Sequence, residues 1–238
     1  MWDALSVQEG RLLAYRYRLG AQLGKGGAAS AYRARDLVTS EDVALKLLAA
    51  EHPPALLQRE FERLRELVHP HLNRVRELCV TRIGERTRAF YTADLVRGGD
   101  LRAHVAEHGF TREPLCDVLD ALHTLHRAGL RHGDVKPENV LIDERGRGVL
   151  IDLGCAAPLG HASAGLSGTP GYMAPELREG RAADERADLY AFGVMLRELG
   201  APFEALIEHL TSEQRPTSAR EVLLALGDQR DVEARRGR

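Results

Sequence analysis

Residues 131–154 limit the possible fold and chemistry of this chain more than any other part of the sequence, because they join a polar segment to a short predicted hairpin. Two apolar runs, at residues 140–142 and 149–151, bracket a turn-like break, and this pattern predicts a pair of short strands. The polar side chains around these strands include those of Asp134, Lys136, Asn139 and Asp152. Together they offer carboxylates and an amide, which suit the handling of metal-bound phosphates beside a reacting hydroxyl group.

The bulk composition is that of a globular protein. The chain has 238 residues, of which 44% are hydrophobic and 29% are charged, so it can bury a core as one large domain or as two small lobes. Its net charge is -2 and only 5% of its residues are aromatic. Both values argue against nucleic-acid binding, which usually needs a basic surface or aromatic side chains that stack on bases.

The cysteines and the absence of long apolar runs bear on the cellular compartment. The chain has three cysteines, and none of them has a Cys-x-x-Cys partner. An odd count without that spacing predicts neither a disulfide framework nor a zinc site, and reduced thiols are typical of a cytosolic protein. The N-terminus lacks a signal-peptide pattern, and no run of about 18 apolar residues occurs. We therefore expect a cytoplasmic protein without a membrane segment.

The first part of the chain has the pattern of a β-rich lobe with one helix. Strand-like patterns occur at residues 15–23, 31–34, 43–48 and 89–96. Pro53 and Pro54 can open a helix after the third of these runs. The apolar stripe expected on that helix consists of Leu57, Phe61, Leu64 and Val68.

The second part of the chain is predicted to be mainly helical. One helix is expected between Pro114 and Gly129, with an apolar stripe of Leu115, Leu119, Leu122 and Leu125. A further helix is expected from Asp188 to Leu199, and residues 218–221 have the pattern of a capping box. The predicted organisation is an N-terminal extension (residues 1–14), a first lobe (15–96), a second lobe (97–228) and a polar tail (229–238).

Two features of the first lobe could bind phosphate, and each also has a purely structural explanation. Gly24, Gly26 and Gly27 lie between two extended runs, where backbone N–H groups could approach a phosphate or simply form a glycine-rich hairpin. Lys46 lies in the centre of an apolar run. It must either point to solvent or have a buried partner, and Glu60 on the following helix is suitable.

The motifs resemble, in their order, those of protein kinases of the bacterial, eukaryotic-like serine/threonine class. The matching segments are the glycine loop (23–32), the V-A-I-K strand (43–46), the helix glutamate (60), the catalytic loop (132–139), the D-F-G motif (152–154), the G-T-x-x-Y-x-A-P-E run (168–176) and a later Asp and Arg (188 and 215). The resemblance implies an α+β, bilobal protein-kinase-like fold. Its N-terminal lobe would be β-rich with one main helix, and its C-terminal lobe would be shortened and mostly helical.

The resemblance also implies a role for each matching residue of the catalytic segment. Asp134 would orient a protein hydroxyl group and accept its proton, and Lys136 would steady the γ-phosphate of ATP. Thr169 and Lys136 resemble the pair that favours serine and threonine over tyrosine as substrates. Asn139 and Asp152 would hold Mg²⁺, or Mn²⁺, through oxygen ligands.

The same resemblance assigns most ATP contacts to the first lobe. Lys46, held by Glu60, would grip the α- and β-phosphates. The remaining contacts would come from Leu23, Gly24, Gly26, Gly27 and Ala31 in the glycine loop, from the backbone of Asp94 and Val96 at the adenine, and from Ala44 and Leu141 on the two faces of the purine.

One departure from the kinase pattern bears on regulation. Gly133 replaces the catalytic-loop arginine that in the family binds phosphate on the activation loop. Without that arginine, a phosphate on Ser163, Ser167 or Thr169 lacks an obvious cation in the pocket. We therefore expect activity that does not require activation-loop phosphorylation.

Other departures leave the substrate open. Ala29 replaces the third glycine of the loop, and Leu153 replaces the phenylalanine of D-F-G. Only residues 200–202 separate the helix predicted at residues 188–199 from the helix predicted at residues 203–210. The family usually has a longer stretch there, which helps dock substrates or partners. The sequence therefore predicts a protein substrate without identifying it, and it leaves the oligomeric state open.

Two other functions compete with that of a protein kinase. The run His132-Gly133-Asp134 also resembles the catalytic motif of small-molecule phosphotransferases, but those enzymes lack the sequence context of Lys136 and the run at residues 168–176. The altered glycine loop and the trimmed second lobe would also suit an ATP-binding pseudokinase that acts as a scaffold. The presence of Asp134 and Asp152 argues against that alternative.

Overall fold

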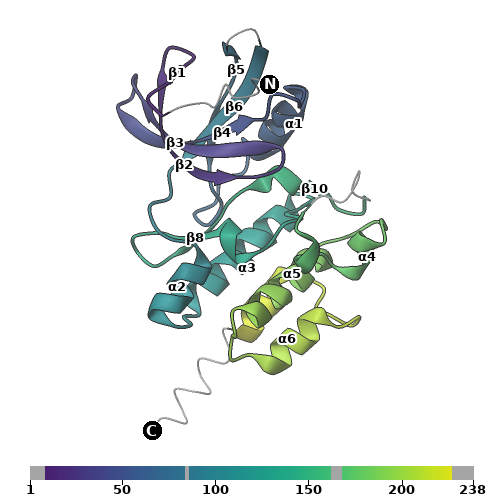
Figure 1. Ribbon diagram of the computed structural model, residues 1–238. Helices are drawn as coiled ribbons and strands as arrows, with labels where there is room; N and C mark the ends of the chain where they lie inside the picture. Colours follow the sequence, from purple (N-terminus) through teal and green to yellow (C-terminus); the bar gives the residue numbers. More distant parts are fainter. Residues whose placement is uncertain (1–8, 84–85, 162–167, 227–238) are drawn as a thin grey trace. The chain divides into compact units, whose positions relative to one another are not determined.

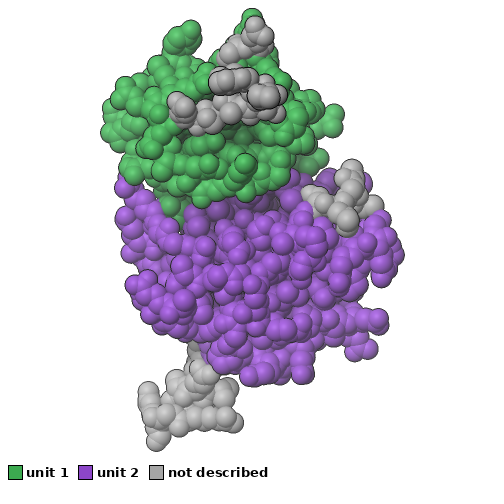
Figure 2. Space-filling view, viewed as in Figure 1, with its two compact units in different colours: residues 1–68, 73–96 green, residues 69–72, 97–238 purple. Residues whose placement is uncertain are grey.

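The computed structural model of the protein describes residues 9–83, 86–161 and 168–226. The chain divides into two compact units (Figure 2). Unit 1 contains the residues up to Val68 together with Asn73–Val96, and unit 2 contains His69–Leu72 together with the residues from Arg97 onward. The predicted polar tail and most of the predicted N-terminal extension lie outside the described residues.

The short segment His69–Leu72 belongs to unit 2, although the sequence places it inside the first lobe. Its backbone explains the difference. The Leu150 N–H donates to the His71 carbonyl oxygen at 2.8 Å, and Leu72 forms a parallel bridge with Leu150. The His71 ring also bonds the Gly148 carbonyl oxygen at 2.9 Å. These contacts are made with residues far away in the sequence, so local patterns do not reveal them.

Unit 1 is built on an antiparallel six-stranded sheet with strand order β1-β2-β3-β4-β6-β5 (Figure 1). The strands are β1 (Leu12–Leu13), β2 (Tyr17–Lys25), β3 (Ala29–Asp36), β4 (Glu41–Leu48), β5 (Val75–Ile83) and β6 (Arg86–Asp94). Alternate residues of β4 explain its central place, because Val43, Leu45 and Leu47 are at most 2% exposed. They join a core cluster with Tyr17 and Phe90, whose rings meet edge to face at 5.6 Å.

The helix of unit 1, α1 (Ala55–Leu64), begins directly after Pro54, as the sequence predicts. Leu57 and Leu64 of the predicted apolar stripe are buried, but Val68 is 72% exposed. The prediction for Val68 is wrong because the helix ends before it. After Leu64 the chain closes with a tighter bond from the Leu67 N–H to the Leu64 carbonyl oxygen, so helical spacing no longer applies.

Unit 2 is mainly helical (Figure 1). Its α-helices are α2 (Leu101–His108), α3 (Glu113–Arg127), α4 (Pro175–Arg178), α5 (Arg186–Glu198) and α6 (Glu204–Thr211), and residues 219–226 are also helical. Its short strands are β7 (Leu130–Arg131), β8 (Val140–Ile142), β9 (Gly148–Leu150) and β10 (Ala157–Pro158). The 3-10 turns are η1 (Pro137–Asn139), η2 (Leu153–Cys155) and η3 (Pro170–Tyr172).

Helix α3 lies in the core of unit 2, as its sequence predicts. Its leucine stripe is completely buried, with 0% exposure at Leu115, Leu119, Leu122 and Leu125. Gly129 follows the helix with a φ of +75°, the left-handed conformation that often ends helices. The helix packs on β7 and β9 and therefore supports the strands that flank the polar catalytic segment.

Helices α5 and α6 pack closely through a glycine. A Cβ atom at Gly193 would lie only 2.7 Å from the Leu210 Cβ, so this contact requires the absence of a side chain. The predicted capping box is present in part, because the Glu221 N–H donates to the Ser218 hydroxyl at 3.2 Å. The Glu221 carboxylate reaches the N–H of Thr217 instead of that of Ser218. The short connection between α5 and α6 agrees with the predicted short C-terminal lobe.

Candidate active site

The β8–β9 hairpin brings together the backbones on either side of it. Asn139 directly precedes β8, and Asp152 follows β9 after one residue. The register pairs Val140 with Leu150, and the Ile151 N–H donates to the Asn139 carbonyl oxygen at 2.9 Å. The predicted hairpin is confirmed, and it holds Asn139 next to the residue that precedes Asp152.

Asp134 is the centre of a hydrogen-bond network on the catalytic loop. The Lys136 ammonium group donates to the Asp134 carboxylate and to the Thr169 hydroxyl, each at 2.7 Å. The Thr169 backbone N–H donates to the other carboxylate oxygen at 2.8 Å. The Asn139 amide donates to the Asp134 carbonyl oxygen at 2.8 Å and to its carboxylate at 3.1 Å. Asp134, Lys136, Asn139 and Thr169, all expected from the sequence to belong to the catalytic or metal site, are therefore neighbours in unit 2.

The network keeps the Asp134 carboxyl group ionised. Asp134 is only 9% exposed, and burial by itself would raise its pKa. The hydrogen bonds from Lys136 and Thr169 favour the charged form and outweigh burial, so the pKa of Asp134 lies below its usual value. A charged, oriented carboxylate of this kind can accept a hydrogen bond from a substrate hydroxyl group.

Asn139 and Asp152 have the donor chemistry that a hard divalent cation requires. Both partners of the Asn139 amide nitrogen are acceptors, so that nitrogen must be the donor, and the amide oxygen is the atom left for a ligand. Asp152 has a left-handed backbone, with φ of 58°, and its carboxylate accepts the Gly154 N–H at 3.2 Å. Two oxygen ligands suit Mg²⁺, which usually completes its shell with water and phosphate oxygens.

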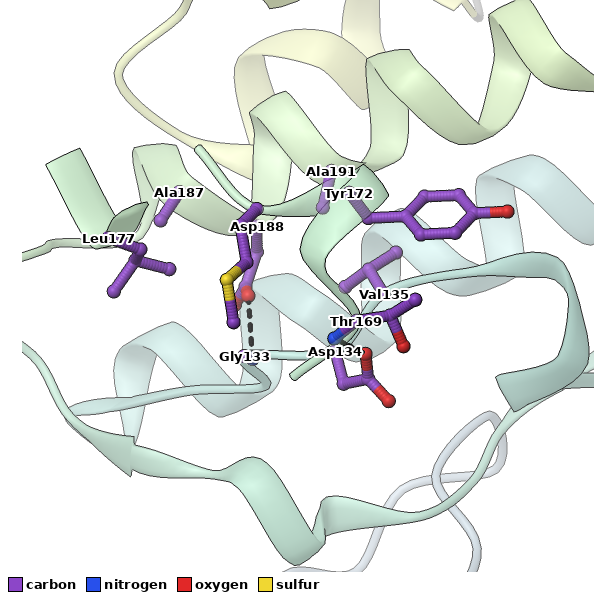
Figure 3. A pocket seen from close by; sticks show the side chains of 10 residues that line it. Gly133, Asp134, Val135, Thr169, Tyr172, Leu177, Ala187, Asp188 and Ala191 are labelled. Atoms are coloured by element: carbon purple, nitrogen blue, oxygen red, sulfur yellow. Dashed lines mark hydrogen bonds between the residues drawn. The ribbon is translucent and has the colours of Figure 1, made fainter. Parts of the chain in front are cut away.

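Asp188, on α5, holds the backbone of the catalytic loop from within the core. Its carboxylate accepts the His132 N–H at 2.7 Å, the Gly133 N–H at 2.9 Å and a hydrogen bond from the His126 ring at 2.9 Å. Figure 3 shows the bond between Asp188 and Gly133 as a dashed line. Burial would raise the pKa of Asp188, but the His126 bond and the backbone bonds lower it. The Asp188 carboxylate thus holds the backbone of the catalytic loop.

A small cavity adjoins this loop (Figure 3). Its walls include Asp134, Thr169 and Asp188 from the network, and Leu177 and Ala191 from α4 and α5. Its volume is about 10 Å³, which is about the size of one water molecule. The cavity is therefore a gap in packing behind the loop and too small to hold a nucleotide or a peptide side chain.

Lys46 forms an ion pair within unit 1. Its ammonium group lies 2.9 Å from the Glu60 carboxylate, and both side chains are mostly buried, at 17% and 12% exposure. The solvent-facing interpretation of Lys46 is therefore wrong. Tyr91, which sequence reasoning missed, donates its hydroxyl hydrogen to Glu60 at 2.8 Å. The register of β4 and β6 places Tyr91 directly opposite Lys46, and only strand pairing reveals that relation.

The glycine segment forms the turn between β2 and β3. The Gly26 N–H donates to the Ala29 carbonyl oxygen at 2.8 Å, which closes the hairpin. A Cβ atom at Gly24 or Gly27 would meet no atom of the described chain within 4 Å. Internal packing therefore does not explain these two glycines, and the surface above them is open to a ligand. Leu23, at 52% exposure, lies beside this surface in the sequence.

The residues expected at the adenine lie on different elements. Ala44 is on β4 and pairs with Ala93, while Asp94 ends β6. The Asp94 N–H already donates to the Arg74 carbonyl oxygen at 2.9 Å, so a bond from its backbone to adenine would use the carbonyl oxygen. Leu141 is on β8, in unit 2.

Gly133 occupies a position that an arginine would strain. Its φ is +79°, and a Cβ atom there would lie 2.6 Å from the Cys155 carbonyl oxygen. Any other residue would need the activation loop to move at its start. Of the candidate phosphorylation sites on that loop, Ser163 and Ser167 lie outside the described residues.

A further set of ion pairs connects α2, α5 and the segment after Thr169. Arg102 lies 2.8 Å from the Glu138 carboxylate and 2.7 Å from that of Glu198, and the Tyr172 hydroxyl donates to Glu198. Sequence reasoning missed this cluster because its members lie on separate elements, and no local pattern connects them.

Comparison with known proteins identifies the family. The profile of the protein kinase domain matches residues 17–231, so the chain belongs to the protein kinase family. The chain is 37% identical to the DNA damage-responsive serine/threonine-protein kinase RqkA of Deinococcus radiodurans, over 81% of this chain and 30% of that protein. It is 33% identical to the serine/threonine-protein kinase pkn3 of Myxococcus xanthus, over 89% and 44%. It is 34% identical to CBL-interacting protein kinase 29 of Oryza sativa subsp. japonica, over 82% and 48%.

The chain thus aligns with less than half the length of these relatives. The resemblance to bacterial eukaryotic-like kinases and the expected α+β kinase fold are confirmed. Within the part of the chain that the structure describes, every helix is too short or too polar to span a bilayer.

Proposed function

We propose that the protein is a serine/threonine protein kinase that transfers the γ-phosphate of ATP to a protein hydroxyl group. The observation that carries the proposal is the network of Asp134, Lys136 and Thr169, in which one buried carboxylate is held by an ammonium group, a backbone N–H and the Asn139 amide. Such fixed groups suit phosphoryl transfer, where positioning and charge stabilisation provide most of the catalysis.

Each catalytic residue has a chemical task in this proposal. Asp134 orients the attacking hydroxyl group and accepts its proton, and its lowered pKa keeps it ionised for that task. Lys136 stabilises the negative charge that develops on the transferred phosphoryl group. The Asn139 amide oxygen and the Asp152 carboxylate would hold a magnesium ion, which would supply positive charge beside the ATP phosphates.

The residues of unit 1 bind the nucleotide in this proposal. Lys46, kept in place by Glu60, contacts the α- and β-phosphates. The open surface above Gly24 and Gly27 receives phosphate oxygens at short distance from the backbone. The adenine contacts are those expected from the sequence, including the backbone of Asp94 and Val96.

The proposed substrate is a serine or threonine of another protein. The bond between Lys136 and the Thr169 hydroxyl supports this choice, because it brings together the two residues that in the family favour these substrates. Both bacterial relatives are named as serine/threonine-protein kinases, which agrees with this substrate class.

We further propose that activity does not depend on phosphorylation of the activation loop. Gly133 supports this, since it stands where the family has the arginine that binds the phosphate, and since a side chain there would meet the Cys155 carbonyl oxygen at 2.6 Å. The Thr169 backbone is held by Asp134 without any phosphate.

A transfer assay tests the proposal. The purified protein is incubated with labelled ATP and Mg²⁺ in the presence of a basic protein substrate or a panel of amino-alcohols. Label on protein serine or threonine, lost in Asp134→Ala and Lys46→Ala, supports the proposal. Label on a small molecule would instead indicate a small-molecule phosphotransferase, and ATP binding without transfer would indicate a pseudokinase.

A further inference from the structure

Arg131 is a buried cation that the proposed reaction does not use. It is the last residue of β7 and directly precedes His132 of the catalytic loop. Its exposure is 0%, although long charged side chains are almost never fully buried without partners. A buried guanidinium group at this place needs a physical explanation.

The guanidinium group binds carbonyl oxygens of two other segments. Its Nη1 donates to the carbonyl oxygens of Pro158 at 3.0 Å and His161 at 2.9 Å, and it also lies 3.5 Å from that of Ala183. Pro158 and His161 belong to the start of the activation loop. Ala183 lies in the connection before α5, the helix that carries Asp188.

Backbone bonds join the same three segments. Ala157 of β10 pairs with Arg131 of β7, and the Leu159 N–H donates to the Gly129 carbonyl oxygen at 2.9 Å. The Gly160 N–H donates to the Ala183 carbonyl oxygen, also at 2.9 Å. Among the described residues, the Arg131 side chain therefore adds a charged hydrogen-bond donor to a contact that main-chain bonds also make, and charged donors form the stronger hydrogen bonds.

The charge of Arg131 is balanced through the catalytic loop. Burial lowers the pKa of Arg131, and the opposite charge of Asp188 partly offsets that effect. Asp188 in turn accepts the backbone N–H groups of His132 and Gly133. The same buried carboxylate thus holds the catalytic loop and stabilises the cation that binds the activation loop.

Position 133, where the kinase family has its arginine, cannot provide this cation. A side chain at Gly133 would collide with the Cys155 carbonyl oxygen, whereas Arg131, two residues earlier, reaches the activation loop from inside the core.

We propose that Arg131 is a positioning residue that fixes residues 157–161 of the activation loop to the catalytic loop and to Ala183. Its effect on catalysis rests on the proposed kinase function, while its effect on the loop does not. The hydrogen bonds of Arg131 are internal, so the start of the loop is ordered without a phosphate group.

The test compares Arg131→Met, which keeps length but removes every donor, with Arg131→Lys, which keeps a charged donor. Arg145→Met is the matched control, because Arg145 is an exposed arginine in the β8–β9 turn of the same unit. Two kinds of measurement are made on dephosphorylated protein: steady-state kinetics, which give kcat and KM for ATP, and amide hydrogen exchange at Leu159 and Gly160.

We expect Arg131→Met to lower kcat roughly tenfold, the effect of losing one charged hydrogen-bond donor, with KM for ATP changed by less than about twofold. Exchange at Leu159 and Gly160 should become faster, while exchange within α3 stays protected. Arg131→Lys should recover part of both effects, and Arg145→Met should behave as the wild type. If Arg131→Met does not fold, Arg131→Gln, which removes the charge but keeps a neutral donor, is compared with Arg131→Lys instead.

The possible failures are distinguishable. Unchanged exchange and kcat in the Arg131 variant would overturn the positioning role, and so would exchange that increases equally in α3. A wild type that transfers no phosphate would refute the kinase function, but the exchange result would still decide the role of Arg131. A wild type inactivated by phosphatase would refute phosphate independence alone.

Discussion

Replacement of Asp188 by asparagine tests the central claim that one buried carboxylate holds the catalytic loop. The two side chains have the same shape, but the amide has one acceptor oxygen where the carboxylate has two. Asp188 is 1% exposed and accepts hydrogen bonds from His132, Gly133 and His126. In Asp188→Asn, an amide N–H must therefore face at least one buried donor group.

The expected loss of stability follows from these contacts. If the amide oxygen keeps the His132 and His126 bonds, the bond to Gly133 is lost and its N–H remains unsatisfied, which costs about 1–3 kcal/mol. The two remaining bonds also lose their ionic character. Together we expect a decrease of about 3–5 kcal/mol in the free energy of unfolding, the usual range for breaking a buried ionic network.

Denaturant unfolding at neutral pH measures this decrease, and Asp120→Asn is the control. Asp120 also pairs with a histidine, His69, at 3.2 Å, but its side chain is 48% exposed. Because solvent screens such a pair, we expect Asp120→Asn to change stability by less than about 1 kcal/mol. Equal effects of the two substitutions would refute the argument.

The pH dependence gives an independent check of the same reasoning. The folded protein lowers the pKa of Asp188, despite burial, mainly through the His126 bond. The carboxylate therefore adds stability above its unfolded pKa of about 4, and that contribution is lost as the pH falls through the lower folded value. The difference between wild type and Asp188→Asn should be constant from about pH 5 to 8 and shrink in acid. A difference that grows on acidification would contradict the assigned contacts.

Four further substitutions test other parts of the molecule. Gly133→Arg should lower the unfolding free energy by about 1–3 kcal/mol, because of the positive φ at this position and the contact with the activation loop. Phosphatase treatment should still leave the variant active. A stable variant that phosphatase inactivates would refute both the strain at position 133 and the phosphate independence. Glu60→Gln removes the charge that holds Lys46 and should lower kcat/KM for ATP about tenfold. Unchanged kinetics would exclude the ion pair from ATP binding. Leu64→Ala should cost about 2–5 kcal/mol in unfolding free energy, whereas Val68→Ser should cost less than about 0.5 kcal/mol, and similar costs would place Val68 in the core.

Secondary structure was predictable where local periodicity was strong. The leucine stripe of α3 and the two apolar runs of β8 and β9 lead directly to elements that the structure contains. Sequence reasoning missed β5, an edge strand with several exposed charged residues, because its side chains do not alternate cleanly between the two faces. It also extended α1 to Val68, because a helical spacing in the sequence does not show where the helix stops.

Part of the candidate site was predictable for a related reason. Asp134, Lys136 and Asn139 are close in the sequence, so any compact loop brings them near one another. The hairpin that carries Asp152 is equally local. Tyr91 and Arg131 were not predictable, because their partners belong to segments that only strand pairing and core packing bring near.

By itself, the sequence determined the kinase family, the catalytic loop and the elements whose hydrophobic pattern repeats within a few residues. Those features depend on residue types and short spacings, which a linear chain displays directly. The tertiary structure confirmed the pairing of Lys46 with Glu60 that the resemblance implies, and it alone showed the contacts by which Asp188 holds the catalytic loop and the burial of Arg131 against the activation loop. The physical reason is that the energy of a buried charge depends on partners far away in the chain, and folding alone brings those partners within hydrogen-bond distance.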